Sequence, residues 1–170
     1  MPAGTQPGKE GKMHPEDILM YGNKTFISTI EAFPAAEVYR SGACGYWSVK
    51  DLVAHLSSYE LILVDVLNNL LKPGPTPQLD TFLGDHMGFN DAQVNARKNM
   101  TMEEVLDEYK AAHEKVRSAA SRISSEVWHQ TGVLPWYGEA YDLEDYAVYQ
   151  FYGHKREHCG QIAVFSDQFK

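Results

Sequence analysis

Apolar residues recur at intervals of three and four along several long stretches of this chain, and this spacing restricts its fold more than any other feature. Such intervals place side chains on one face of an α-helix, whereas a half-buried strand would show an alternation of two. The pattern covers about residues 15–33, 49–71, 102–123 and 143–169, without strand-like alternation or internal repeats. The sequence therefore predicts an all-α protein, a four-helix bundle.

Helix start and stop signals support these ranges. Ser48, Thr101 and Asp142 are expected N-caps, because each precedes an acidic first turn. The proline-rich residues 72–77 cannot continue the second helix, and the connection is expected to last until about residue 88. A connection of this length predicts a crossover between the second and third helices.

The inner face of the first helix is expected to carry Ile18, Tyr21, Thr25, Phe26, Thr29 and Phe33. His113 falls at the edge of the inner face of the third helix and is interpreted as structural. His86, in the crossover, is expected at the surface.

A chain of 170 residues fits one domain, expected over residues 13–170, and the Gly/Pro-rich residues 1–12 are expected to form a disordered tail. The net charge of −8 and the absence of a basic run argue against nucleic acid and against an anionic membrane surface as partners. No stretch of about 18 apolar residues and no secretory h-region is visible. We therefore expect a cytoplasmic protein in which Cys44 and Cys159 are free thiols.

Histidines interrupt the inward stripes of two helices. His154 and His158 are four residues apart and share one stripe with Leu143, Ala147, Gln150, Gln161 and Phe165, while His55 lies in the apolar stripe of the second helix. Buried polar groups need partners, which here would be either a metal ion or a metal-free hydrogen-bond network.

Three inward imidazoles with one open position form the ligand set of a catalytic zinc-type site, and nickel, iron(II) or manganese also bind imidazole. Gln150, Gln161 and Glu157 are candidates for hydrogen bonding to the ligands. His154 to His158 also matches the His-x-x-Glu-His pattern of some zinc peptidases, which requires a carboxylate ligand downstream. No glutamate follows His158, and Asp167 would lie about 13 Å further along the helix, so we exclude a peptidase.

Two segments resemble a known family. Residues 45–56, from Gly45-Tyr46-Trp47-Ser48 to His55-Leu56, are similar to the G-x-W-S-x-x-D-x-x-x-H-L signature of DinB-like (damage-inducible) proteins. Residues 152–162 are similar to the H-x-x-x-H-x-x-Q-I segment of their last helix. The resemblance spans about residues 15–169 and implies a four-helix bundle with a long crossover, one divalent metal ion on His55, His154 and His158, and often a homodimer.

The resemblance leaves the activity open. Relatives include S-transferases that use bacillithiol or mycothiol and maleylpyruvate isomerases, and hydrolytic roles have been proposed. One hypothesis is an enzyme in which the metal activates a low-molecular-weight thiol or a water molecule against a small electrophilic substrate. The alternatives are a non-catalytic, metal-stapled dimerising bundle, and a metal-dependent hydrolase or isomerase of a small molecule.

Five further residues complete the candidate site. Trp47, Trp136 and Tyr152, together with Tyr137, could line a pocket for substrate or cofactor, although buried aromatic residues are also ordinary core. Glu157 could act as a base, and the alternative for it is a solvated ion pair with Lys155 or Arg156.

Overall fold

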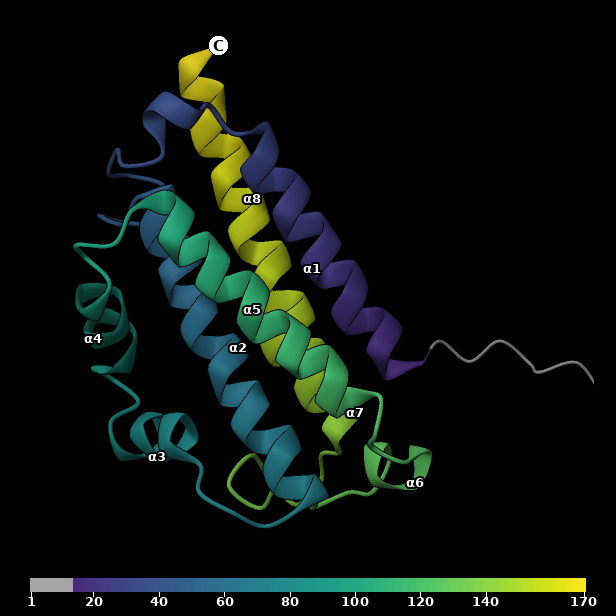
Figure 1. Cartoon of the computed structure of the whole chain (residues 1–170). Helices are drawn as coiled ribbons and strands as arrows, with labels where there is room; N and C mark the ends of the chain where they lie inside the picture. Colours follow the sequence, from purple (N-terminus) through teal and green to yellow (C-terminus); the bar gives the residue numbers. More distant parts are fainter. Residues whose placement is uncertain (1–13) are drawn as a thin grey trace, which may run out of the picture.

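The computed structural model describes residues 14–170 and arranges them almost entirely as helices and loops (Figure 1). The expected tail, residues 1–12, lies outside the described residues. The long helices α1 (Pro15–Ala32), α2 (Val49–Leu71), α5 (Met102–Ala120) and α8 (His154–Ser166) lie side by side. Between residues 14 and 170 there is no β-strand, so the prediction of an all-α protein is confirmed.

The N-caps expected from the sequence are present. The Ser48 hydroxyl accepts a hydrogen bond from the Asp51 amide, and the Asp51 carboxylate accepts one from the Ser48 amide. Thr101 and Glu104 form the same reciprocal pair at the start of α5. Each pair satisfies two backbone donors that the first helical turn would leave unpaired.

The connection after α2 is more ordered than expected, because it contains the helix α3 (Pro77–Gly84) before α4 (Phe89–Ala96). Pro77 occupies the first turn of α3, where its missing N–H costs nothing. The carboxylate of Asp65 on α2 accepts hydrogen bonds from the amides of Gln78 and Leu79. This cap comes from a distant residue, which is why the local pattern did not reveal the helix.

The inner face of α1 is rotated relative to the expectation. Its buried residues include Leu19, Gly22 and Ile30, whereas Tyr21 and Thr25 are exposed. A Cβ at Gly22 would lie 3.4 Å from the Tyr152 ring, so this glycine forms a close contact with the last helical stretch. Glycine does not stand out as apolar in a sequence, so the predicted inner face was placed on the neighbouring residues instead.

The last helical stretch is not one regular helix. After the short α6 (Ser125–Trp128) and a loop, α7 (Leu143–Ala147) runs into a π-helical segment (Val148–Gly153), and only then does α8 begin at His154. A π-helix carries one more residue per turn than the regular ladder and turns the residues that follow it about the helix axis. This segment therefore helps set the direction in which His154 and His158 point.

The buried apolar residues form two clusters, one at each end of the long helices. One cluster contains Ile62, Val116 and Phe151, and the other contains Leu52, Tyr109 and Ile162. Between them, on α2, α5 and α8, lie buried or half-buried polar residues that we call the polar layer: His55, Glu60, His113, His154, Lys155 and His158. None of the helices between residues 14 and 170 has the length and apolar character needed to cross a membrane.

Candidate metal centre

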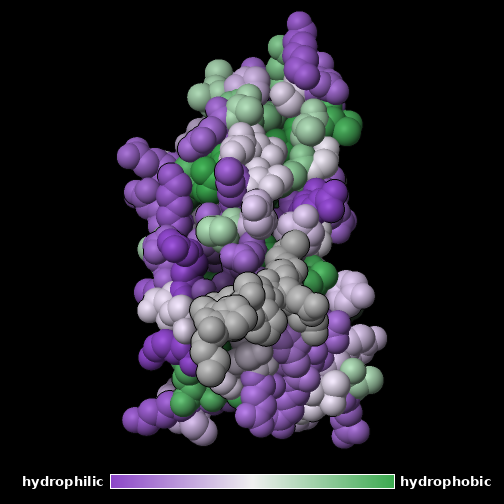
Figure 2. All heavy atoms as spheres, turned by 90° about the vertical axis from the view of Figure 1, so that its right-hand side faces the viewer, coloured by the Kyte–Doolittle hydropathy of each residue, from purple (hydrophilic) through white to green (hydrophobic). Residues whose placement is uncertain are grey.

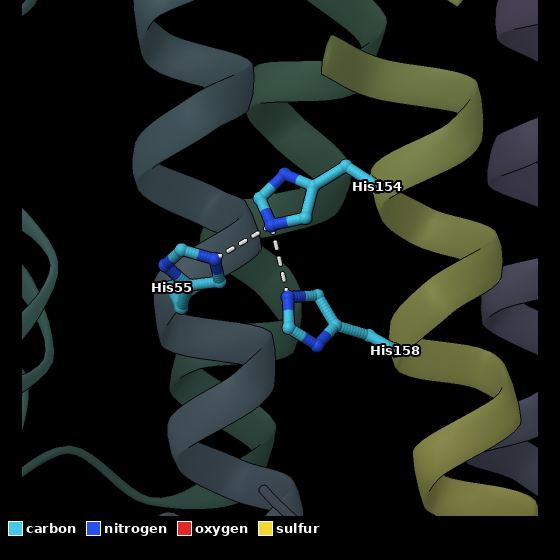
Figure 3. A group of neighbouring side chains, drawn as sticks. All are labelled: His55, His154 and His158. Carbon is cyan, nitrogen blue, oxygen red and sulfur yellow. Dashed lines mark hydrogen bonds between the residues drawn. The ribbon is translucent and has the colours of Figure 1, made fainter. Parts of the chain in front are cut away.

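The structure brings His55, His154 and His158 together (Figure 3). The Nε2 atom of His154 lies 2.9 Å from the Nε2 atom of His55 and 2.9 Å from that of His158. His55 reaches the site from α2, and the other two project from successive turns of α8. His55 and His158 are only 2% and 5% exposed, so bulk water does not solvate these rings freely.

Hydrogen bonds fix the orientation of two of the rings. The Nδ1–H of His158 donates to the carboxamide oxygen of Gln161 over 2.8 Å. The ring of His154 forms a hydrogen bond with the backbone of Gln150, and because its Nε2 faces the other histidines, Nδ1 is the donor. A neutral imidazole carries a single N–H, so the Nε2 atoms of His154 and His158 both present lone pairs.

The two opposed lone pairs show whether the site could accommodate a metal ion. His154 Nε2 and His158 Nε2 face each other at 2.9 Å, and in the tautomers assigned above, with each proton on Nδ1, neither neutral ring has a proton to place between them. A cation between the rings would satisfy both lone pairs at once. In a tetrahedral zinc site with Zn–N bonds of about 2.0–2.1 Å, the ligand nitrogens are about 3.3 Å apart. Two of the three nitrogen pairs here are 2.9 Å apart, and all three nitrogens lie within 4.8 Å of one another. The geometry and the donor type therefore fit a divalent metal ion.

Burial keeps the three rings in the neutral form that a metal requires. Burial, followed by the charges of the other two histidines, lowers the pKa of His55 to about 2. Burial and His158 lower the pKa of His154 to about 3, and burial also lowers the pKa of His158. Protons therefore compete weakly for the nitrogens at neutral pH.

Aromatic rings enclose the site on the α2 side. The Trp47 ring lies 5.0 Å from the His55 ring between centroids, and the Tyr59 ring lies 4.9 Å from His55 and 4.7 Å from His154. The Nδ1 atom of His55 is buried and has no hydrogen-bond partner among the described residues. Packing against Trp47 and Tyr59, rather than hydrogen bonding, holds this ring in place.

A charged cluster lies beside the histidines in the polar layer. The Glu60 carboxylate accepts hydrogen bonds from the Lys155 ammonium and, over 2.9 Å, from Nδ1 of His113. The side chains of Glu60 and Lys155 are 1% and 2% exposed. Burial alone would raise the pKa of Glu60, but Lys155 and His113 outweigh this effect and lower it. Lys155 follows His154 directly, so the pair fastens α8 to α2 at the height of the histidines.

The other predicted site residues are distributed around this centre. Trp47 contacts His55, as described above, and Trp136 lines a separate pocket together with Tyr59. Glu157 is exposed, and its charge only partly opposes burial, which lowers the pKa of His158. The Tyr152 ring lies between Gly22 of α1 and the guanidinium group of Arg156, and it does not contact the three histidines. The alternative of an ion pair between Glu157 and Lys155 is wrong, because Lys155 is buried against Glu60.

Three residues of the centre were not identified as site residues from the sequence: Tyr59, Glu60 and Lys155. Tyr59 follows His55 by one helical turn on α2 and so shares its inward face. That spacing was a usable signal. Glu60 and Lys155 gave none, since a lone charged residue on a helix is ordinarily solvated. His113 proved structural, as predicted, through its bond to Glu60, and His86 is exposed, as predicted.

These observations define an all-helical protein whose polar layer contains three histidines that could hold a metal ion. The chain matches the DinB superfamily over residues 22–162 and belongs to that family, which confirms the resemblance noted in the two sequence segments. The matched region includes all three histidines. Comparison with curated proteins and with solved structures gave no match.

Proposed function

We propose that this DinB-like chain is a metal-dependent enzyme in which His55, His154 and His158 hold one divalent ion. The observation that carries the proposal is the pair of opposed Nε2 lone pairs on His154 and His158, 2.9 Å apart in a buried site. We assign the fold to a four-helix bundle with the crossover between α2 and α5, on the basis of the side-by-side long helices. The function would be the activation of a thiol or water against a small electrophile.

The metal would supply Lewis acidity, which lowers the pKa of a thiol or water beside it and gives a nucleophile at neutral pH. The protein's own residues have separate tasks. Trp47 and Tyr59 exclude bulk water from the rings, and Gln161 orients His158 through its hydrogen bond. The exposed Glu157, near His158, is the candidate acceptor for the released proton.

Zinc and nickel are the metals that we favour, with iron(II) and manganese as alternatives, because three imidazoles suit all of them. The test is elemental analysis of tag-free protein purified without chelator or immobilised metal. We expect about one divalent ion per chain, its loss in His154→Ala, and its retention in His129→Ala. His129 is a matched control because it is exposed and pairs with Glu144 instead. Protein without metal that also fails to take up zinc or nickel would refute the proposal.

The enzymatic part has its own test. A low-molecular-weight thiol and a small electrophile are supplied to metal-loaded and metal-free protein, and conjugation is followed. We expect turnover that requires metal and is lost in His158→Ala. Equal rates with and without metal would refute the thiol-transfer activity while leaving the metal site intact.

A non-catalytic role is the second candidate, and the position of the histidines favours it specifically. One ion would join α2 to α8 across the polar layer, and a ligand that binds only the folded state stabilises it by mass action. The expected result is a melting temperature that falls on chelation, with no turnover of any electrophile. A melting temperature indifferent to both chelator and metal would exclude this role.

We also propose a homodimer in the cytoplasm. Tyr21 on α1 and Val164 on α8 are 54% and 70% exposed, and they line a groove between these helices. Figure 2 shows the face of the molecule on which α1 lies, where apolar residues are interspersed with hydrophilic ones. The test is sedimentation of the wild type and of Val164→Glu, and we expect the added charge to weaken the dimer.

The proposed cytoplasmic location rests on the cysteines. The free thiols of Cys44 and Cys159 support a reducing compartment.

A further inference from the structure

A pocket of about 130 Å³ lies between α2, α3 and the loop that precedes α7, on the far side of Tyr59 from His55 and His154. Tyr59, Phe82, Trp136, Tyr137 and Tyr146 supply its aromatic lining. The pocket runs from the exposed His86 to the buried Tyr146, so a ligand could enter it from solvent. Nothing in the mechanism outlined above uses this space.

The aromatic rings brace one another. Trp136 and Tyr146 meet edge to face at 5.3 Å between centroids, and Tyr137 lies 4.8 Å from Tyr146. On the other side, Phe82 lies 6.0 Å from Tyr59 in a similar edge-on arrangement. Rings held in this way present both edges and faces to the pocket, which favours an aromatic guest over an aliphatic one of equal size.

The lining is mainly aromatic, and His86 at its mouth is the one basic side chain in it. Among the residues that the structure places around the pocket, there is no Asp, Glu, Lys or Arg. Burial raises the pKa values of Tyr59, Tyr137 and Tyr146, so their phenols stay protonated. The Tyr59 O–H donates to Asn90 Oδ1 over 3.3 Å, so its oxygen can only accept a hydrogen bond from a guest. The Gln150 carboxamide is hydrogen-bonded to Tyr137 and adds a neutral donor and acceptor. An organic cation would find ring faces here but no carboxylate.

The pocket and the histidines share a wall. Tyr59 lines the pocket, and its ring also contacts His55 and His154. Gln150 lines the pocket too, and its backbone bonds to the His154 ring. A molecule held in the pocket would therefore have one end beside the candidate metal centre.

We propose that this pocket binds a neutral, single-ring aromatic group that bears a hydroxyl or similar hydrogen-bonding substituent. An apolar protein cavity of about 150 Å³ accommodates benzene, so the volume here suits one ring and not two. Resting on the proposed function, the inference then names the substrate class: a small aromatic compound whose electrophilic substituent reaches toward the three histidines.

The test uses phenol as the probe, titrated by calorimetry into full-length, metal-free protein. We expect saturable one-to-one binding, with cyclohexanol and tetramethylammonium each at least about tenfold weaker, a difference of about 1.4 kcal/mol. In the NMR spectrum the indole N–H signal of Trp136 should shift with phenol, while that of the core residue Trp128 should not.

Variants of Phe82 change the size of the pocket. Phe82→Trp should reduce phenol binding at least about tenfold by filling the space, and Phe82→Ala should move the preference from phenol to 2-naphthol. The matched control is Leu83→Ala, on the same helix and packed on the core but outside the pocket lining. The gain of 2-naphthol binding cannot arise from misfolding, so it protects the test against a variant that is merely destabilised.

Each outcome is decisive for one statement. Absence of phenol binding, equal binding of cyclohexanol, or tighter binding of tetramethylammonium would overturn the pocket assignment, whatever the metal content. Phenol binding to a protein that takes up no metal would keep the pocket and refute the proposed metal-dependent function. Phenol binding without any effect on the metal-dependent turnover of an aromatic electrophile would overturn the assignment of the substrate class.

Discussion

Replacing Lys155 by methionine should destabilise the protein severely, because it leaves the Glu60 carboxylate buried without its strongest partner. Both side chains are nearly inaccessible, at 1% and 2% exposure, so water cannot replace the lost ammonium. Breaking a buried ion pair by removing one partner costs about 3–5 kcal/mol. For a chain of this length, that corresponds to a melting temperature lower by roughly 6–20 °C.

The chain provides a matched control in an exposed ion pair. Arg117 and Glu114 lie 3.1 Å apart with side chains 54% and 69% exposed. Pairs of this kind contribute about 0–1 kcal/mol, so Arg117→Met should have little effect. The double variant Glu60→Gln/Lys155→Met should recover most of the stability lost in Lys155→Met, since it removes both charges together and keeps an acceptor for the Nδ1–H of His113.

The assay is urea unfolding followed by circular dichroism, in the presence of chelator so that metal occupancy does not vary between variants. The free energies of unfolding of the two single variants and of the double variant are compared with that of wild type. If Lys155→Met cost no more than Arg117→Met, the Glu60–Lys155 contact would not be the buried clamp described here. A double variant as unstable as the single one would instead show that packing, and not charge, causes the loss.

Three further predictions concern neighbouring features. The pKa of Glu60 is lower in the folded state, so its contribution to stability is present above its unfolded pKa of about 4.5 and is lost as the pH falls through the folded-state value. Glu60→Gln should therefore reduce the fall in melting temperature as the pH is lowered. An unchanged fall would contradict this reasoning. Deletion of the exposed Tyr149 should convert the π-helical segment to regular α-helix and retain metal uptake, because a π-turn absorbs one extra residue and its removal leaves His154 and His158 facing His55, whereas loss of uptake in a folded variant would refute this account of the segment. Gly22→Ala should be neutral or stabilise the protein by up to about 1 kcal/mol, since its Cβ would make ordinary contacts with Tyr152. Gly22→Leu should destabilise it by about 1–3 kcal/mol, because the larger side chain does not fit there. A higher melting temperature for Gly22→Leu than for Gly22→Ala would refute the reasoning.

Local signals in the sequence were enough to predict the long helices and the histidine cluster. Capping pairs such as Ser48 with Asp51 lie within one turn, and the spacing of His154 and His158 is read on a single helix. His55 lies far away in sequence, but its place in an apolar stripe showed that it points inward. For these features, helical periodicity carries the information directly.

The features that were missed depend on contacts between distant residues. Asp65 caps α3 from another helix, and Gly22 is buried because Tyr152 comes close to it. Glu60 and Lys155 are 95 residues apart and would each be assigned to the surface when considered alone. Burial is possible only because the two charges neutralise each other. The residue pattern of one helix does not show which residue of another helix will pair with it.

The polar layer also separates the two ends of the molecule. The buried apolar residues of the described chain fall into two clusters, and the layer lies between them. Substitutions within one cluster therefore change packing at that end without passing strain directly into the other. The pocket residues that do not touch the histidines, such as Phe82 and Trp136, could thus diversify over evolution or be redesigned in the laboratory, while Tyr59, the histidines and the opposite end stay fixed. The polar layer thus separates an end of the molecule whose packing can vary from an end whose packing is kept.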